Sequence, residues 1–367
     1  MENLRALTVY GSKISYFTGK LEGYLRYKEI PYRFQAMTSE YFNTIVPEKT
    51  GAQQMPAVEL SDGRWMTDTT PIIDWLESKY VQQPVIPADP VQAFICRLLE
   101  DYADEWLWRP AMHYRWSYRR SQKALSAFIV DELFDEVKAP FFLKCWKISK
   151  RQKSNFVDGD GVTEKTRSHV EHSYLHILRM LENILKKRPF LLGDKPSLAD
   201  IGLFGPMFRH FALDPTPAEI MREQAPGVFE WVARLWNSKA SMVSGGWLEG
   251  IPDDWSPILT EIGETHLKNL SANADAFNRG QATYGVSIQC TEYNDLPVSR
   301  YRVWCLERLR EHFEAMSGVT RDSTRQILET CNCWEPFWRV EVVQSAYDME
   351  KHAPFAPGLK VYPVDGA

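Results

Sequence analysis

At the start of the chain, the spacing of hydrophobic residues is typical first of a strand, then of a helix and then of a strand again. This order limits the folds that the chain can adopt. The apolar run LRALTVY at residues 4–10 predicts a buried strand. Residues 15–28 then place apolar side chains at helical spacing, and a second short strand, YRF, follows Pro31. Strand, helix and strand in this order predict a small α/β unit.

A hairpin and a helix complete this unit. Two short runs, AVEL and RWMT, flank Asp62-Gly63, and an Asp-Gly pair suits a tight turn between antiparallel strands. Asp68 and Thr69 are favourable N-cap residues for the apolar helix that follows. We therefore predict an α/β domain over residues 1–83.

The middle of the chain predicts helices. Prolines 84, 87 and 90 mark a linker, and helical periodicity dominates from about residue 90 to residue 240. Ser197 precedes Asp200 by three residues, which is the spacing of a capping box at the start of a helix. Residues 215–237 predict one further helix. An all-helical domain over residues 90–250 follows from these patterns.

The remaining residues, 251–367, predict a mixed α/β extension of unknown role. Apolar spacing predicts a helix over residues 259–277 and another over residues 301–316. Residues 284–290 alternate between apolar and polar side chains, as a half-buried strand does.

Length and composition exclude several classes of protein. A chain of 367 residues is too long for one ordinary core and suits two or three domains. Its net charge of −5 argues against a nucleic-acid binder. No run of about 18 apolar residues predicts a membrane span, and the first residues lack an apolar signal core. We expect a cytoplasmic protein without a nucleic-acid or membrane partner.

Three stretches together resemble the glutathione S-transferase superfamily, of the cytosolic type. They are KLEGYLRYKEIPY, which starts at Lys20, then QMPAV with DG and TDTTPI, and GDKPSLAD, which ends at Asp200. Their order and spacing make the resemblance specific to the superfamily. The chain is also similar to a group of larger bacterial glutathione-transferase-like proteins that carry a C-terminal extension.

The resemblance implies a thioredoxin-like N-terminal domain, an all-α C-terminal domain and glutathione as co-substrate. It also implies a small-molecule electrophile as the second substrate and a homodimer as the family habit. The extension could close over the active site, cover a surface that usually mediates dimerisation, or bind a partner.

The chemistry of glutathione explains where a catalytic hydroxyl belongs. A free thiol has a pKa near 8.5, and its thiolate is the nucleophile. A hydroxyl donor and the positive end of a helix both stabilise the thiolate. Ser15 stands where the first helix begins, and by the resemblance it falls on the position of the catalytic Ser in serine-type enzymes. The rival hydroxyls are Tyr10 and Tyr16, and the plain alternative is that Ser15 only caps the helix.

The resemblance also implies the residues that bind glutathione. The peptide bond before Pro56 should be cis, so that the backbone of Met55 pairs with the cysteinyl part. Asp68 would bind the γ-glutamyl ammonium, and Thr69 would hold its carboxylate at the start of a helix. Gln54 is a further polar candidate. The family more often has Glu or Gln followed by Ser at the positions of Asp68 and Thr69, so the pocket could be altered; both residues could also serve only as caps.

The second substrate should bind between the domains, and residues 105–120 are the densest aromatic and basic stretch there. Within it, His113, Tyr114, Arg115 and Trp116 could grip an aromatic or acidic electrophile. Helix packing is the alternative interpretation.

Three histidines share one face of a predicted helix, which suits metal ligands. They are His169, His172 and His176, and their face lies away from the apolar stripe. We expect a solvated face or a contact with the extension, and no metal site. The sequence thus favours a serine-type glutathione transferase, and the alternative is a non-catalytic binding or scaffold protein with the same fold.

Overall fold

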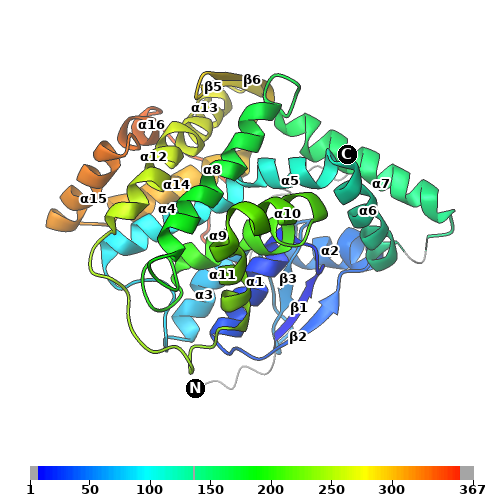
Figure 1. Ribbon diagram of the computed structural model, residues 1–367, viewed down its shortest axis with the longest axis horizontal. Helices are drawn as coiled ribbons and strands as arrows, with labels where there is room; N and C mark the ends of the chain where they lie inside the picture. Colours follow the sequence, from blue (N-terminus) through cyan, green and yellow to red (C-terminus); the bar gives the residue numbers. More distant parts are fainter. Residues whose placement is uncertain (1–6, 135–136, 356–367) are drawn as a thin grey trace.

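The computed structural model describes residues 7–134 and 137–355 (Figure 1). It begins with a four-stranded sheet in the order β2-β1-β3-β4, in which β1 and β2 are parallel and the other neighbours are antiparallel. Helices α1 and α3 pack on one face of this sheet, and α2 packs on the other face. The elements are β1 Leu7–Gly11, α1 Tyr16–Tyr27, β2 Tyr32–Ala36, a π-helical turn Tyr41–Ile45, α2 Val46–Thr50, β3 Ala57–Glu59, β4 Trp65–Thr67 and α3 Thr69–Lys79.

The predicted local signals explain how this domain forms. Gly63 has a φ of 84°, which favours glycine, and the Asp62 side chain accepts a bond from the Arg64 N–H at 3.0 Å. The predicted hairpin between β3 and β4 is therefore confirmed. The helix predicted over residues 15–28 is confirmed as α1, and the predicted strand at residues 4–10 is observed from Leu7 onward, its first residues lying outside the described part.

The second part of the chain is helical, as predicted. Its helices are α4 Pro90–Glu105, α5 Trp108–Trp116, α6 Arg119–Leu133, α7 Phe141–Phe156, α8 Arg167–Leu185, α9 Leu198–Pro206, α10 Pro215–Gln224 and α11 Pro226–Asn237. Helix α9 packs against both α1 and α4, so it joins the two domains. The capping box is confirmed, because Asp200 Oδ2 accepts the Ser197 N–H at 2.9 Å.

Two single helices predicted from periodicity are each divided in the structure. The helix predicted over residues 215–237 is divided between α10 and α11, because Pro226 has no N–H to continue the first helix. The helix predicted over residues 259–277 is divided at Thr265, whose φ of −121° and ψ of −77° are not helical. Apolar spacing continues through both breaks, which is why periodicity alone missed them.

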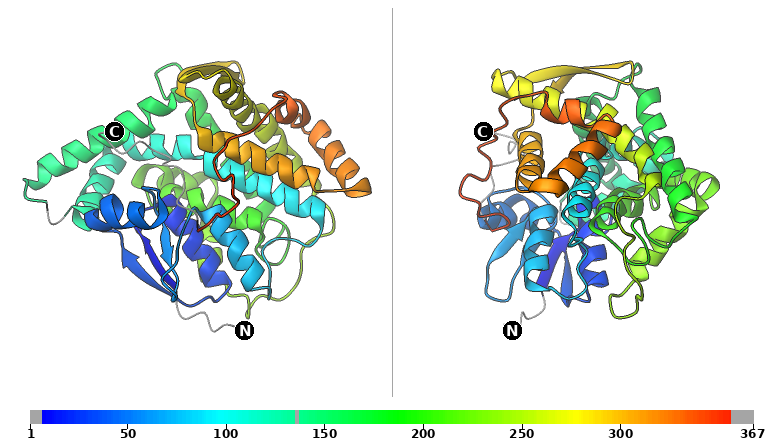
Figure 2. Two further views of the ribbon diagram at one scale, coloured as in Figure 1. Left: turned by 180° about the vertical axis from the view of Figure 1, so that it is seen from behind. Right: turned by 90° about the vertical axis from the view of Figure 1, so that its left-hand side faces the viewer.

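The extension packs against the helical domain and shares its apolar core. Its elements are α12 Ser256–Glu264, α13 His266–Asn278, β5 Thr283–Ile288, β6 Thr291–Pro297, α14 Arg300–Glu314, α15 Gly318–Thr330 and α16 Trp334–Trp338. Helices α12, α14 and α15 all contact α4. Residues 341–355, here called the C-terminal strap, then run back across α14 and α4 toward α3 (Figure 2, left). The sequence did not predict β6, α15 or α16.

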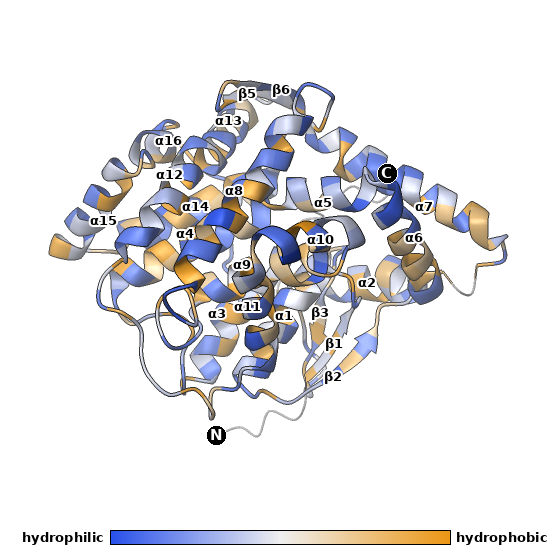
Figure 3. Cartoon of the chain, in the orientation of Figure 1, coloured by the Kyte–Doolittle hydropathy of each residue, from blue (hydrophilic) through white to orange (hydrophobic). Residues whose placement is uncertain are grey.

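Helices α6 and α7 pack on each other and project from the body of the molecule (Figures 1 and 2). The outer end of α7 carries exposed hydrophobic residues, which Figure 3 shows in orange. Over residues 7–134 and 137–355, no helix is long and apolar enough to cross a membrane.

Candidate active site

Ser15 caps the first turn of α1 and is half-buried. Its Oγ accepts a hydrogen bond from the Thr18 N–H at 3.3 Å. Because Oγ acts as the acceptor in this bond, the hydroxyl proton stays available for a second partner. Among residues 7–134 and 137–355 no acceptor takes the Ser15 O–H, so Ser15 combines an available donor with the positive end of α1, which is the arrangement that stabilises an anion.

Two buried arginines, Arg115 and Arg209, bind the backbone of the loop that precedes Ser15. Arg115 donates to the Ile14 carbonyl at 3.0 Å, and Arg209 donates to the Lys13 carbonyl. Arg115 is itself fixed by a two-pronged ion pair with Asp214, at 2.7 and 2.9 Å. These bonds position the N-terminus of α1, and sequence reasoning did not find them because the partners lie about a hundred or more positions apart.

A second hydroxyl lies close to Ser15. Ser12 is 2% exposed, and its Oγ donates to Glu132 of α6, which also accepts the Lys13 N–H at 3.3 Å. The Ser12 hydroxyl is therefore engaged, in contrast to that of Ser15. The sequence-based prediction did not include Ser12 or Glu132. The one signal for Ser12 was its position three residues before Ser15 in the sequence.

The two rival tyrosines are packed side chains. Tyr10 points to the α2 face of the sheet, where it stacks on Trp65 and donates to Glu59 Oε2 at 2.8 Å. Burial, followed by the bond to Glu59, raises the pKa of the Tyr10 phenol. Tyr16 is 1% exposed and donates its hydroxyl to the Ala103 carbonyl. Burial also raises the pKa of Tyr16 well above its usual range. Both hydroxyl protons are already used.

The residues expected to bind the cysteinyl part of glutathione lie at the start of β3. The Met55–Pro56 peptide bond is cis, as predicted, and Met55 is half-buried. The Gln54 side chain donates to Thr67 Oγ1 at 2.7 Å, so it links the loop before β3 to the end of β4. Gln54 thus helps to fix the position of the Met55 backbone.

Asp68 caps α3 and contacts the extension. Its Oδ1 accepts the Thr70 N–H at 3.3 Å, and its Oδ2 accepts the hydroxyl of Tyr301 in α14 at 2.9 Å. Burial raises the pKa of Asp68 to about 6, although the Tyr301 bond and the charge of Lys20 oppose this rise. The carboxylate expected to bind an ammonium group is thus occupied on one oxygen by a residue that sequence analysis did not single out.

The C-terminal strap covers the same end of the site. The Pro354 carbonyl accepts the Thr67 N–H at 3.2 Å, so the strap pairs with the free edge of β4. Phe355 packs edge-on against Trp75 of α3, with ring centroids 5.3 Å apart. Thr69 is only 3% exposed at the start of α3. The extension therefore does close over one part of the predicted glutathione site.

A buried ionic cluster lies beneath Asp68. Lys20 of α1 is fully buried and pairs with Glu100 at 2.5 Å and with Asp104, both on α4. Burial opposes the charge on Lys20, but the carboxylates of Asp104 and Glu100 raise its pKa. Burial raises the pKa of Asp104 well above its usual range, although Lys20 lowers it. One cation thus balances two buried carboxylates, and Thr70 Oγ1 joins the cluster by a 2.6 Å bond to Glu100.

A cavity of about 310 Å³ opens beside this cluster, between α3, α4, α14 and the strap. Acidic, aromatic and basic side chains all line it. The lining includes Thr70, Asp74, Trp75, Arg97, Glu100, Asp101, Asp104, Glu105, Tyr301, Trp304, Cys305, Arg308 and Lys351. Because Tyr301 lines the cavity and bonds Asp68, the cavity adjoins the expected γ-glutamyl position.

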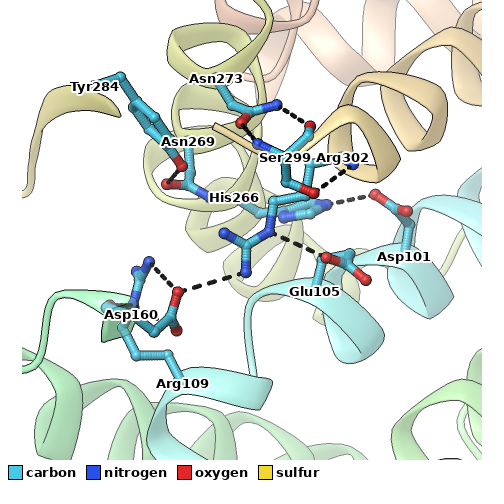
Figure 4. Close-up of polar contacts among 10 residues, drawn as sticks. All are labelled: Asp101, Glu105, Arg109, Asp160, His266, Asn269, Asn273, Tyr284, Ser299 and Arg302. Atoms are coloured by element: carbon cyan, nitrogen blue, oxygen red, sulfur yellow. Dashed lines mark hydrogen bonds and ion pairs between the residues drawn. The ribbon is translucent and has the colours of Figure 1, made fainter. Parts of the chain in front are cut away.

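Polar contacts anchor the extension on α4 (Figure 4). Arg302 of α14 forms ion pairs with Glu105 at 3.1 Å and with Asp160 at 3.5 Å. Asp160 forms a second ion pair with Arg109 at 3.2 Å. His266 of α13 pairs with Asp101 at 2.6 Å (Figure 4). These contacts hold α14 in register with α4, and so they fix Tyr301 against Asp68.

The predicted substrate residues are interior side chains. His113 is 1% exposed and bonds Glu171 at 3.0 Å, and Tyr114 and Trp116 are each 2% exposed. Tyr114 stacks on Tyr118 with ring centroids 5.3 Å apart. This burial favours helix packing, the alternative given by the sequence, over contact with a substrate.

A half-buried aromatic surface lies nearer to Ser15. Phe17 stacks on Trp108, with ring centroids 5.9 Å apart, and Trp108 contacts Phe156 of α7 edge-on at 5.7 Å. All three side chains are partly exposed. Trp108 belongs to the aromatic stretch at residues 105–120 that the sequence singled out. Periodicity did not predict that Trp108 stays partly exposed while His113, Tyr114 and Trp116 are buried.

Two of the three histidines of α8 contact the extension, whereas His172 is exposed, so each of the two predicted outcomes is found. His169 bonds Tyr293 at 2.7 Å and Gln289 at 2.9 Å, and His176 bonds Glu261 at 3.2 Å. Within the described ranges, no group of three or more His, Cys, Asp or Glu side chains could hold a metal ion.

Comparisons with known proteins agree with the two-domain arrangement. Residues 9–84 match the family described as "Glutathione S-transferase, N-terminal domain", and residues 136–239 match "Glutathione S-transferase, C-terminal domain". A search of curated protein sequences found no significant match.

Solved structures with a similar fold include several glutathione S-transferases. One from Pseudomonas fluorescens is 19% identical, covers 63% of this chain and 94% of its own, and has a TM-score of 0.37. The β-etherase LigF from Sphingobium is 18% identical over 63% of this chain and 95% of its own, with a TM-score of 0.44. One from Methylobacterium radiotolerans, in complex with glutathione sulfonate, is 17% identical over 68% of this chain and 99% of its own, with a TM-score of 0.39.

The thioredoxin-like sheet, the helical domain and the two family matches lead to one assignment. The chain belongs to the glutathione S-transferase superfamily.

Proposed function

We propose that this protein is a serine-type glutathione transferase, in which Ser15 stabilises the glutathione thiolate. The observation that carries the proposal is the free O–H of Ser15 at the N-terminus of α1. Lowering a thiol pKa by about two units requires about 2.7 kcal/mol of preference for the anion. A hydrogen bond to a charged group contributes about 1.5–3 kcal/mol and a helix terminus about 0.3–1 kcal/mol, so their combined contribution of about 1.8–4 kcal/mol spans the required value.

In the reaction, the thiolate attacks an electrophilic carbon of a small molecule. A sulfur–carbon bond forms, and the leaving group departs with the electron pair of the bond that breaks. The same thiolate would serve conjugation, dehalogenation, ether cleavage or a reversible addition that drives an isomerisation. The half-buried aromatic surface of Phe17, Trp108 and Phe156 supports an apolar or aromatic electrophile.

Glutathione would be held by the residues between α1 and α3. The backbone of Met55, positioned through Gln54 and followed by Pro56, would pair with the cysteinyl part. Asp68 would bind the γ-glutamyl ammonium, and Thr69 would offer its N–H to the carboxylate. Because Tyr301 occupies Asp68 Oδ2, this step requires the ammonium to share or displace that bond. A homodimer and a cytoplasmic location remain predictions from the sequence.

The test is calorimetric titration of glutathione into the wild type and Ser15→Ala, together with the thiolate absorbance followed against pH. We expect both proteins to bind glutathione, and only the wild type to show a thiol pKa below about 8.5. Equal pKa values in both complexes would contradict the role of Ser15.

The second candidate is a non-catalytic binding or scaffold protein with this fold. The contacts of Tyr301 with Asp68 and of Pro354 with Thr67 favour it, because both lie over the residues that we expect to bind glutathione. A wild-type protein that binds no glutathione in the same titration would establish this alternative over the enzyme.

A further inference from the structure

Helix α7 presents an exposed apolar end that no described segment covers. Phe142 is 69% exposed and Trp146 is 62% exposed, and Phe141 and Leu143 beside them are each nearly half exposed. Large apolar side chains that are grouped and accessible usually mark an interaction site, whereas singly scattered ones need no explanation. These four residues, here called the α7 apolar tip, lie within a single turn and a half of helix.

The same helix is strongly basic. Residues 141–156 contain five Lys or Arg and no Asp or Glu. The wider segment from residue 119 to residue 156 contains nine basic and four acidic residues, although the whole chain has a net charge of −5. The positive charge is therefore concentrated on the projecting pair α6–α7, and the rest of the molecule is negative.

Apolar and basic side chains occupy one continuous ridge of α7. Phe142, Trp146 and Lys150 follow each other at intervals of four residues, so they lie on the same side of the helix. Lys150 Nζ lies 5.3 Å from the centre of the Trp146 ring. Lys147, which is exposed, stands on the flank of this ridge. The opposite side of α7, which includes Ile148, packs onto the protein.

The exposed aromatic side chains and the lysines of α7 together limit the kinds of partner that this helix can bind. A second copy of the chain that docked α7 against α7 would bring two sets of cations together, which costs free energy. A helix with Lys on its polar flank and Trp and Phe on its apolar side fits the boundary between lipid headgroups and acyl chains. There the aromatic rings enter the acyl boundary, and the lysines reach anionic headgroups.

We propose that the α7 apolar tip and its lysines dock this protein on a bilayer surface that contains anionic lipid. This is peripheral binding without a membrane-spanning helix, and it departs from the sequence-based expectation of no membrane partner. The inference goes beyond the proposed function and does not depend on it. Because α6 packs on α7 and its Glu132 bonds Ser12 next to Ser15, a single helix connects the docking helix to the candidate active site.

The test is flotation of the full chain with vesicles of phosphatidylcholine alone and of phosphatidylcholine with about 30% phosphatidylglycerol, at low and high salt. We expect binding to the anionic vesicles only, and weaker binding at high salt. Lys147→Ala/Lys150→Ala should weaken binding by about 30-fold, because each basic residue near an anionic surface contributes about a factor of five. Phe142→Ala/Trp146→Ala should also weaken it, at every salt concentration.

Matched controls lie on other faces. Lys79→Ala/Lys239→Ala removes two exposed lysines, and Val319→Ala trims a side chain that is 79% exposed. Both should bind vesicles as the wild type does, and circular dichroism should show that every variant is folded. Failure of the wild type to float with anionic vesicles would overturn the proposal. An equal loss of binding in Lys79→Ala/Lys239→Ala would also overturn it. A wild type that does not bind vesicles but self-associates, and loses this self-association in Phe142→Ala/Trp146→Ala, would assign the tip to a contact between copies of the chain instead.

Discussion

The hydroxyl of Tyr301 donates a hydrogen bond to Asp68 Oδ2 at 2.9 Å, and this bond joins two residues that are 233 positions apart. Asp68 begins α3 in the thioredoxin-like domain, and Tyr301 lies in the first turn of α14 in the extension. The carboxylate proposed to bind the γ-glutamyl ammonium therefore already has a donor from the same chain. If Asp68 binds glutathione as proposed, the ligand and Tyr301 of the extension compete for one carboxylate oxygen atom.

Replacing Tyr301 by Phe should tighten glutathione binding at pH 8. The change removes the competing donor, and a hydrogen bond to a charged group is worth about 1.5–3 kcal/mol. Part of this is offset because Asp68 becomes harder to ionise, so we expect a gain of about 5- to 20-fold in affinity by calorimetry. Tyr284→Phe is the matched control, since that hydroxyl bonds Asn269 at 3.0 Å inside the extension. Weaker binding in Tyr301→Phe would show that its hydroxyl belongs to the ligand site.

The affinity for S-methylglutathione should fall as the pH drops below about 6. Burial raises the pKa of Asp68 to about 6, and only the ionised carboxylate attracts an ammonium group. The blocked thiol of this ligand does not titrate, so the effect reports on Asp68 and not on the sulfur. Asp68→Asn should bind more weakly at pH 8 and lose this pH dependence. An unchanged pH profile in Asp68→Asn would assign the titration to another group.

The two neighbouring serines should differ in their effect on the bound thiol. Ser15→Ala removes a free hydroxyl donor and should raise the pKa of bound glutathione toward about 8.5. Ser12→Ala removes a hydroxyl that is already donated to Glu132, so it should leave that pKa unchanged. The thiolate absorbance against pH measures both, and a shift in Ser12→Ala of the same size would transfer the donor role to Ser12.

Lys20→Met should destabilise the fold by about 3–5 kcal/mol, because it leaves Glu100 and Asp104 buried without their cation. Denaturant unfolding followed by tryptophan fluorescence measures the loss. Adding Glu100→Gln to this variant should restore part of the stability. The matched control is Arg120→Met, which breaks the exposed pair with Glu219 and should cost less than about 1 kcal/mol. Equal costs in the two single variants would contradict the buried cluster as a source of stability.

A chain that ends at Val340 should open the covered end of the site. It lacks the strap, and with it the bond from the Thr67 N–H to the Pro354 carbonyl. Arg310 still bonds the carbonyls of Phe337 and Val340, so α14 and α16 should stay in place. Hydrogen exchange should then be faster at the Thr67 amide and unchanged at the Ala57 amide of β3. Unchanged protection at Thr67 would show that the strap does not pair with β4 in solution.

The features that the sequence predicted correctly are those decided within a few residues. Ser15 caps α1, Gly63 allows the β3–β4 turn, and Asp200 closes the capping box with Ser197. Each depends on a side chain and a backbone group that are close neighbours along the chain, so the residue types are sufficient. The family resemblance rests on these same local signals.

The predictions that failed or stayed open concern contacts between distant segments. Periodicity could not show that one apolar stripe is divided at Pro226 and another at Thr265, because both helices of each pair face the same core. It could not show that His113 faces the interior, because a polar residue inside a helical pattern is buried only if a partner such as Glu171 meets it.

The sequence by itself determined the family, the order of the domains and the place of Ser15 at a helix start. Only the tertiary structure decided that the Ser15 hydroxyl donates to no acceptor in the described part of the chain, whereas those of Ser12, Tyr10 and Tyr16 are engaged. It also decided that the extension seats Tyr301 on Asp68. The physical reason is that a hydroxyl's availability depends on which acceptor the folded chain brings within about 3 Å of it.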